Sequence, residues 1–132
     1  MFAVILIVVA AVFGCIVATR WYWAGGINTH FPDLTDQIIV VTGANTGLGY
    51  ESVKFMSNLN AKTIVLACRS EERASAAITQ IKKCNKVENI VFMKLDLSDL
   101  QSVKEFAAEF NEKYDKLDIL LNNAGIMALP VR

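Results

Sequence analysis

The chain has 132 residues, with 13 basic and 13 acidic side chains, so its formal net charge at neutral pH is zero. The two signs are interspersed from Arg20 onward, which excludes the basic patches that bind nucleic acid, and no nucleic-acid partner is expected. Hydrophobic residues make up 54% of the chain, which fits one small globular domain plus an unusually apolar segment. Three cysteines are an odd set, so neither a disulfide framework nor a metal site is predicted.

The apolar surplus lies at the N-terminus, where residues 2–19 contain no charged side chain. A helix of this length spans about 27 Å, close to the hydrocarbon thickness of a bilayer. A cleaved signal peptide normally begins with basic residues, and none precedes this run. Arg20 and the aromatic residues 21–23 suit the membrane interface. We therefore expect a transmembrane anchor over residues 1–23, with a signal peptide or a buried core helix as alternatives.

The lipid bilayer is thus an expected partner, and the protein is expected to be single-pass. The positive-inside rule, applied to Arg20 and His30, favours a cytosolic C-terminal part. The sequence contains no Asn-x-Ser/Thr glycosylation site, which agrees with that orientation. The expected location is the endoplasmic reticulum membrane, with the domain facing the cytosol.

Residues 24–36 are a polar, glycine-containing connector, after which apolar runs alternate with amphipathic stretches. The apolar runs predict four strands, at residues 37–42, 63–67, 89–95 and 118–122. The stretches between them predict three helices: from Leu48 to about Leu59, from Glu71 with Ser70 as N-cap and Cys84 on its apolar face, and after Ser98, which forms a capping box with Gln101.

Strands that alternate with helices require right-handed crossovers and a parallel sheet. The expected fold is α/β, the first half of a Rossmann-type doubly wound parallel sheet, with strand order 3-2-1-4 and a transmembrane helix before it. The sequence ends ten residues after the fourth predicted strand. A fourth strand with no neighbour would leave an apolar edge unpaired. We therefore expect residues 37–132 to be the N-terminal part of a larger, truncated dinucleotide-binding domain.

The segment TGANTGLG, residues 42–49, follows the first predicted strand and opens the next helix. Gly43 permits a tight turn, Gly47 lets the backbone approach a pyrophosphate, and Gly49 lets the helix pack closely on the strand. Phosphate oxygens would meet the free N–H groups at the helix start. A glycine-rich turn without a ligand is the alternative. The predicted cofactor-binding residues here are Gly43, Asn45, Thr46, Gly47, Leu48 and Gly49.

The end of the second predicted strand bears on the choice of dinucleotide. Folds of this class place an acidic residue there to bind the adenosine ribose, whereas this chain has Cys68 followed by Arg69. No carboxylate would repel a 2′-phosphate, and the Arg69 guanidinium could pair with it. The sequence therefore favours NADP(H) over NAD(H). The alternative is a solvated arginine that pairs with Glu71 or Glu72.

The ends of the other two predicted strands also carry candidate residues. Asp96 and Leu97 could bond the adenine edge through a carboxylate and a backbone N–H, unless Asp96 caps the following helix instead. After the fourth strand, Asn123 could brace neighbouring loops, and the small Ala124 and Gly125 would let the backbone approach a ribose. The alternative for this last segment is ordinary turn chemistry.

The motifs TGANTGLG, CR, DLSD and NNAG, in this order, resemble the short-chain dehydrogenase/reductase family over residues 37–128. Behind an N-terminal anchor, VVTGANTGLG, LACRS, KLDLSD and LLNNAGIM look like its membrane-bound retinol dehydrogenase-like branch. The resemblance implies an NADP-dependent oxidoreductase that interconverts an alcohol and a carbonyl on a small lipophilic substrate such as a retinoid. This chain would be its cofactor-binding half.

The resemblance also implies an Asn, a Ser and a Tyr-x-x-x-Lys pair for catalysis in the second half of the family's domain. Residues 50–54, YESVK, match the last pattern. In the predicted fold they lie on the helix that holds the pyrophosphate, away from the nicotinamide. We therefore interpret Tyr50 and Lys54 as solvated helix surface, and no catalytic residue is predicted in this chain. The alternative function is a catalytically incomplete, membrane-tethered nucleotide-binding module or an inactive fragment.

Overall fold

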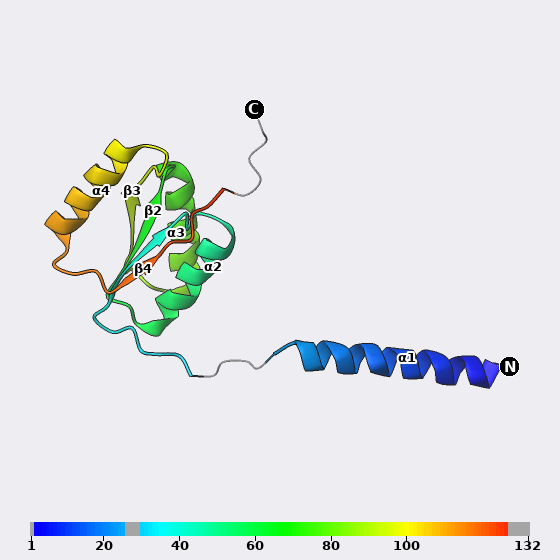
Figure 1. Ribbon diagram of the computed structural model, residues 1–132. Coiled ribbons are helices and arrows are strands. Elements are labelled where there is room, and N and C mark those ends of the chain that lie inside the picture. Colours follow the sequence, from blue (N-terminus) through cyan, green and yellow to red (C-terminus); the bar gives the residue numbers. More distant parts are fainter. Residues whose placement is uncertain (1, 26–29, 127–132) are drawn as a thin grey trace, which may run out of the picture. The chain divides into compact units, whose positions relative to one another are not determined.

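The computed structural model describes residues 2–25 and 30–126 and divides into two compact units, Met1–Phe31 and Pro32–Arg132 (Figure 1). The first unit contains helix α1 (Phe2–Trp23), whose 22 residues make it about 33 Å long. Its stretch Leu6–Trp23 has a mean hydropathy of 1.8, so by length and composition the helix could cross a membrane. A signal sequence near the N-terminus would have the same properties.

The second unit is built on a four-stranded parallel sheet with the order β3-β2-β1-β4, as predicted. Each strand ends within one residue of its predicted boundary. The strands are β1 (Ile38–Thr42), β2 (Thr63–Cys68), β3 (Ile90–Lys94) and β4 (Ile119–Leu121). The central strand β1 is buried along its whole length, because helices cover both faces of the sheet.

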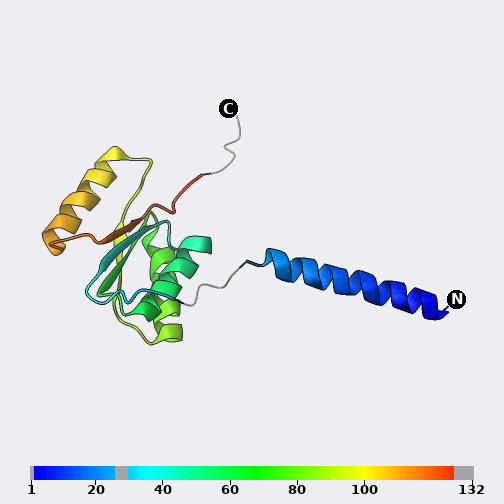
Figure 2. The ribbon, with the colours of Figure 1, turned by 60° about the horizontal axis from the view of Figure 1, so that its bottom comes forward.

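Two helices cover one face of the sheet and a third covers the other (Figures 1 and 2). On the first face lie α2 (Gly47–Met56), which continues into the 3-10 turn η1 (Ser57–Leu59), and α3 (Glu71–Asn85). On the second face lies α4 (Leu100–Lys113). Ser70 caps α3 as predicted, because its hydroxyl accepts from the Arg73 N–H.

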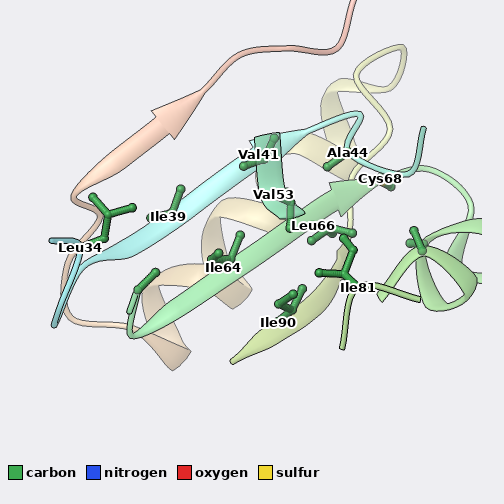
Figure 3. Close-up of a cluster of buried hydrophobic side chains, with 13 residues drawn as sticks. Leu34, Ile39, Val41, Ala44, Val53, Ile64, Leu66, Cys68, Ile81 and Ile90 are labelled. Atoms are coloured by element: carbon green, nitrogen blue, oxygen red, sulfur yellow. The ribbon is translucent and has the colours of Figure 1, made fainter. Parts of the chain in front are cut away.

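The larger hydrophobic core lies between the sheet and α2 with α3 (Figure 3). Alternate residues of each strand point into it, as the two-residue period of a strand requires. Leu34, from the segment before β1, joins this core and is 4% exposed, and its N–H donates to Leu59 O at 2.8 Å. The core includes Leu34, Ile39, Val41, Val53, Ile64, Leu66, Ile81 and Ile90.

The predicted capping box of α4 is wrong. The N-cap is Asp99, whose carboxylate accepts from the Gln101 N–H at 2.9 Å, and the helix begins at Leu100. Aspartate and serine are about equally good N-caps. The Ser98 hydroxyl is engaged elsewhere, since it donates to Asp96 Oδ1 at 2.6 Å. Asp96 therefore shapes the turn before α4 and does not cap the helix.

The predicted burial of Cys84 is also wrong, because its side chain is exposed. In the last turn of α3 the inward position belongs to Asn85, four residues after the buried Ile81. The Asn85 amide donates to Lys54 O at 2.6 Å and to Ser57 Oγ at 2.7 Å. The helix end is thus fastened to α2 by hydrogen bonds rather than by an apolar contact.

Strand β4 is fastened to β1 at both ends, and this fixes the segment that follows it. At the first end, Asp118 Oδ2 accepts from the Ile38 N–H at 2.8 Å. At the other, the Asn123 N–H donates to Thr42 Oγ1 at 3.0 Å. Residues 122–126 are thereby held beside the glycine-rich loop that follows β1.

Candidate functional site

A cleft of about 530 Å³ lies where the parallel strands end, which is where ligands bind in open α/β sheets. Segments that follow all four strands contribute to its lining, so residues far apart in the sequence meet there. The lining consists of Gly43, Asn45, Ala67, Cys68, Arg69, Leu95, Asp96, Leu97, Ser98, Ala124, Gly125 and Ile126. Of the predicted cofactor-binding residues, the structure brings together Gly43, Asn45, Arg69, Asp96, Leu97, Ala124 and Gly125; Thr46, Gly47, Leu48, Gly49 and Asn123 lie outside the lining.

Two glycines of the loop are required by close contacts. Gly43 has a φ of +64°, and a Cβ there would lie 3.0 Å from the Ala124 Cβ. Gly49 is the third residue of α2, and a Cβ there would lie 2.9 Å from Gly43 O and 2.5 Å from Asn123 Nδ2. These contacts match the roles predicted for the two positions, a tight turn and close packing of the helix.

Gly47 is not required by a close contact, because a Cβ there would meet no atom of the described residues within 4 Å. Its φ of +62° still favours glycine. It opens α2, whose first N–H groups lack acceptors within the helix. Thr46, the N-cap, has an extended backbone, and its side chain makes no cap hydrogen bond in the described structure. The start of α2 therefore presents free N–H groups and the positive end of a helix dipole, the arrangement that binds phosphate.

A polar contact between the ends of β1 and β4 holds the glycine loop in place. The hydroxyl of Thr42, which is 4% exposed, accepts from Asn123 N at 3.0 Å and Ala124 N at 2.9 Å. The Asn123 side-chain amide donates to Thr42 O at 3.0 Å and Gly43 O at 3.3 Å. Asn123 therefore braces the loop, as the sequence indicated, and does so from behind the cleft rather than from its lining.

The end of β2 gives the cleft a neutral floor next to a positive side chain. Burial raises the pKa of the Cys68 thiol, although the N–H groups of Ala44, Asn45 and Gly43 oppose that shift. The thiol is therefore uncharged at neutral pH. Arg69 is exposed, and within the described part of the chain no ion pair joins it to Glu71 or Glu72. Its guanidinium is available to an anion in the cleft.

The turn after β3 is shaped by two serines. Ser98 donates to Asp96 Oδ1 from both its N–H, at 3.0 Å, and its hydroxyl, at 2.6 Å. Ser102, 8% exposed, accepts from the Asp96 N–H at 3.0 Å. The bonds from Ser98, and then the charges of Arg69 and Lys94, hold the pKa of Asp96 below its usual value. Asp96 is thus an ionised carboxylate with one oxygen engaged by the turn.

The YESVK segment lies on α2, away from the cleft lining. Tyr50 is half-buried and packs against the larger core, so its interpretation as solvated surface needs correction. Lys54 Nζ lies 3.9 Å from Glu51 Oε2, one turn earlier in the helix. Tyr50 lies three residues before the buried Val53, so the two side chains share the inward side of α2.

Several cleft residues were not identified from the sequence. The role of the Thr42 hydroxyl depends on N–H groups about 80 positions later, although a β-branched hydroxyl directly before Gly43 is a usable signal. The sequence predicts a helix cap at Ser98, whereas the position of Ser98 two residues after Asp96 is the signal of an Asx-type turn. Ala67, Leu95 and Ile126 supply apolar lining that the sequence does not distinguish from core.

Comparison with known proteins agrees with this geometry. The sequence profile of the short chain dehydrogenase family matches residues 37–131. The chain belongs to that family of oxidoreductases. A short-chain dehydrogenase/reductase of Armillaria gallica is 50% identical over 100 residues, which are 76% of this chain and 32% of that protein. Retinol dehydrogenase 12 of Mus musculus is 37% identical over 111 residues, 84% of this chain and 35% of that protein.

The fold is likewise that of solved family members. A metagenomic short-chain oxidoreductase, crystallised in complex with NADP, matches with a TM-score of 0.64 and 30% identity. The match covers 71% of this chain and 41% of that one. The chain thus spans about a third of the length of the curated relatives it matches. It corresponds to an N-terminal portion of a retinol dehydrogenase-like member of the family.

Proposed function

We propose that this chain is the NADP(H)-binding half of a membrane-anchored dehydrogenase/reductase. The whole protein would interconvert an alcohol and a carbonyl on a lipophilic substrate such as a retinoid. The observation that carries the proposal is the cleft in which the glycine loop, Arg69, the Asp96–Leu97 turn and residues 124–125 converge. The similarity to a retinol dehydrogenase supports the substrate class.

The positions of these residues favour one orientation of a dinucleotide in the cleft. The pyrophosphate would lie at the start of α2, where Gly47 leaves open space and the N–H groups are free. The adenine would lie by Asp96 and Leu97, and a ribose would meet the small residues Ala124 and Gly125. NADP(H) supplies hydride chemistry when bound, and the residues of this chain bind and orient it.

Preference for the phosphorylated dinucleotide rests on charge at the end of β2. The buried, neutral Cys68 places no negative charge where the adenosine ribose would bind. The exposed guanidinium of Arg69 lines the same cleft and could form a bidentate pair with a 2′-phosphate. Both features favour NADP(H) over NAD(H).

Helix α1 supports the proposed attachment to a bilayer. Its apolar length matches a membrane span, and Trp21 and Trp23 stand at the end where an interface would lie. In this proposal residues 1–23 anchor the protein, residues 24–36 connect the anchor to the domain, and residues 37–132 face the cytosol from the endoplasmic reticulum. A substrate dissolved in the bilayer would then be close to the enzyme.

The test is a titration of the full 132-residue chain, in detergent micelles or nanodiscs, with NADPH and with NADH. We expect NADPH to bind about tenfold more tightly, the difference that one charge-assisted contact supplies. Arg69→Gln should weaken NADPH binding about 5- to 20-fold and leave NADH binding nearly unchanged. Arg73→Gln, on the exposed surface of α3, is the matched control.

Two outcomes would contradict the proposal at different points. If the folded chain binds neither nucleotide, the cleft is not a dinucleotide site. If Arg69→Gln weakens NADPH and NADH equally, the site remains but Arg69 does not recognise a 2′-phosphate.

A further inference from the structure

Lys94 occupies a position next to the proposed 2′-phosphate site that the sequence does not reveal. It is the last residue of β3, and the sheet register places it directly beside Cys68 of β2. The pairing continues past it, since Leu95 N donates to Cys68 O at 3.0 Å. Neighbouring strands lie about 4.8 Å apart, so the backbone of Lys94 adjoins the residue that precedes Arg69.

The side chain of Lys94 leaves the sheet on the same face as Cys68. Alternate residues of a strand share a face, and Ile90 and Phe92 pack into the cluster that contains Leu66 and Cys68. Lys94 is the next residue in that row, and it is exposed where Ile90 is buried. Its ammonium therefore lies beyond the apolar core; Lys94 does not itself line the cleft, but its neighbours Cys68 and Leu95 do.

Two cations lie near the Asp96 carboxylate. Arg69 and Lys94 both act on the Asp96 carboxylate, which places the three groups at one end of the sheet. The ion pairs in residues 2–25 and 30–126 involve Lys54, Lys82, Lys113 and Lys116, so neither Arg69 nor Lys94 belongs to one. Because neither cation is engaged in one of these ion pairs, both can act on an additional anion, although Glu71 and Glu72 lie nearby at the start of α3.

We propose that Lys94 and Arg69 together form the subsite for the 2′-phosphate of NADP(H), with Lys94 as a second specificity-determining residue. This inference rests on the proposed function, which supplies the ribose position at the end of β2. Arg69 provides the planar fork for two phosphate oxygens, and Lys94 provides a point charge from the neighbouring strand. The competing explanation is that Lys94 only protects the exposed edge of β3 from pairing with another chain.

The experiment measures the contribution of the 2′-phosphate to binding by using adenosine nucleotides that lack the nicotinamide half. The full chain is titrated with 2′,5′-ADP and with 5′-AMP, which differ only in the 2′-phosphate. We expect Lys94→Gln to weaken 2′,5′-ADP binding about three- to tenfold and to change 5′-AMP binding less than twofold. Lys94→Arg should retain the preference, and Lys83→Gln, an exposed lysine in the last turn of α3, should leave both affinities unchanged. Equal melting temperatures would show that the variants remain folded.

The outcomes separate this inference from the proposed function. A wild-type chain that prefers 2′,5′-ADP, with the preference intact in Lys94→Gln, overturns the role of Lys94 and leaves the proposed function standing. A wild-type chain that binds neither nucleotide overturns both. A loss of preference in Lys94→Gln that Lys94→Arg restores supports the two-cation subsite and excludes a role limited to the sheet edge.

Discussion

The cleft has two walls of different construction. The inner wall consists of the lining residues Gly43 and Ala124 and of Thr42, Gly49 and Asn123, which brace them from behind. It is held by hydrogen bonds of about 3 Å and by contacts that leave no space for a Cβ. The outer wall consists of the lining residues Arg69, Asp96, Leu97 and Ser98 and of the adjacent Lys94, and it is largely exposed and charged. Shape is therefore fixed by one wall, and selection among nucleotides is left to side chains of the other.

This division has a physical cause. Packed contacts resist displacement, so they can hold a loop where a pyrophosphate must fit within a few tenths of an ångström. Exposed charges contribute little to the free energy of folding, so substituting them can change ligand binding without unfolding the protein. We therefore expect substitutions in the inner wall to reduce stability, and substitutions in the outer wall to change binding with the fold intact.

The largest effect is expected for Gly49→Ala. The new Cβ would lie 2.9 Å from Gly43 O and 3.0 Å from the Ala44 Cα, and these backbone atoms cannot rotate away. Overpacking of this kind should lower the free energy of unfolding by about 1–3 kcal/mol, despite a gain of up to about 1 kcal/mol in helix propensity. Urea unfolding of the full chain in mild detergent measures the difference.

The control for Gly49→Ala is Gly125→Ala, in the lining of the same cleft. Among the described residues, a Cβ at Gly125 would have no neighbour within 4 Å, and the φ of Gly125 lies outside the left-handed region. We expect a change within about 0.5 kcal/mol. Equal stability of the two variants would refute the claim that the inner wall is held by packing.

A loss of at most the same size is expected for Thr42→Val, which replaces a hydroxyl by a methyl group of similar size. The N–H groups of Asn123 and Ala124 would lose their acceptor at a residue that is 4% exposed. The cost of leaving them unpaired should be about 1–3 kcal/mol by the same unfolding measurement. Thr42→Ser keeps the hydroxyl and should recover most of the loss; if it does not, the methyl group rather than the hydrogen bonds matters.

The fold was predictable from the sequence because its determinants are local. Each strand is a short β-branched run, and the helix patterns between them leave one connectivity for a parallel sheet. The roles of the glycines were predictable for the same reason, since the turn at Gly43 and the packing of Gly49 are properties of one strand-to-helix connection. Their predicted geometry is confirmed on these grounds.

The features that were not predictable from the sequence depend on contacts across the sheet, or on small energy differences between alternative caps at a helix end. Thr42 finds its partners about 80 residues later, and Lys94 gains its position only from the register with Cys68. At the start of α4, two acceptors stood in adjacent positions, Ser98 and Asp99. Their energies as N-caps are nearly equal, so only the competing bond from Ser98 to Asp96 decides between them.

The smallest effect is expected for Asp96→Asn, and it takes the form of a pH dependence. The bonds from Ser98 hold the pKa of Asp96 below its usual value, so the ionised carboxylate stabilises the fold at pH values above the unfolded pKa of about 3.9. That contribution is lost as the pH falls through the lower, folded pKa. Asparagine does not titrate, but its carbonyl oxygen can still accept both bonds from Ser98.

The melting temperatures of wild type and Asp96→Asn should therefore differ slightly near pH 7 and converge as the pH falls through the folded pKa of Asp96. Asp115→Asn, at an exposed carboxylate outside the ion pairs of the described residues, is the control for the loss of a surface charge and should melt at the wild-type temperature near pH 7. A large difference at pH 7 would contradict the division between the walls, because it would mean that the fold depends on an outer-wall charge. A small difference in melting temperature that disappears at acid pH would show that the turn persists without the charge of Asp96. Asp96 would then belong to the outer wall, whose side chains affect ligand binding more than stability.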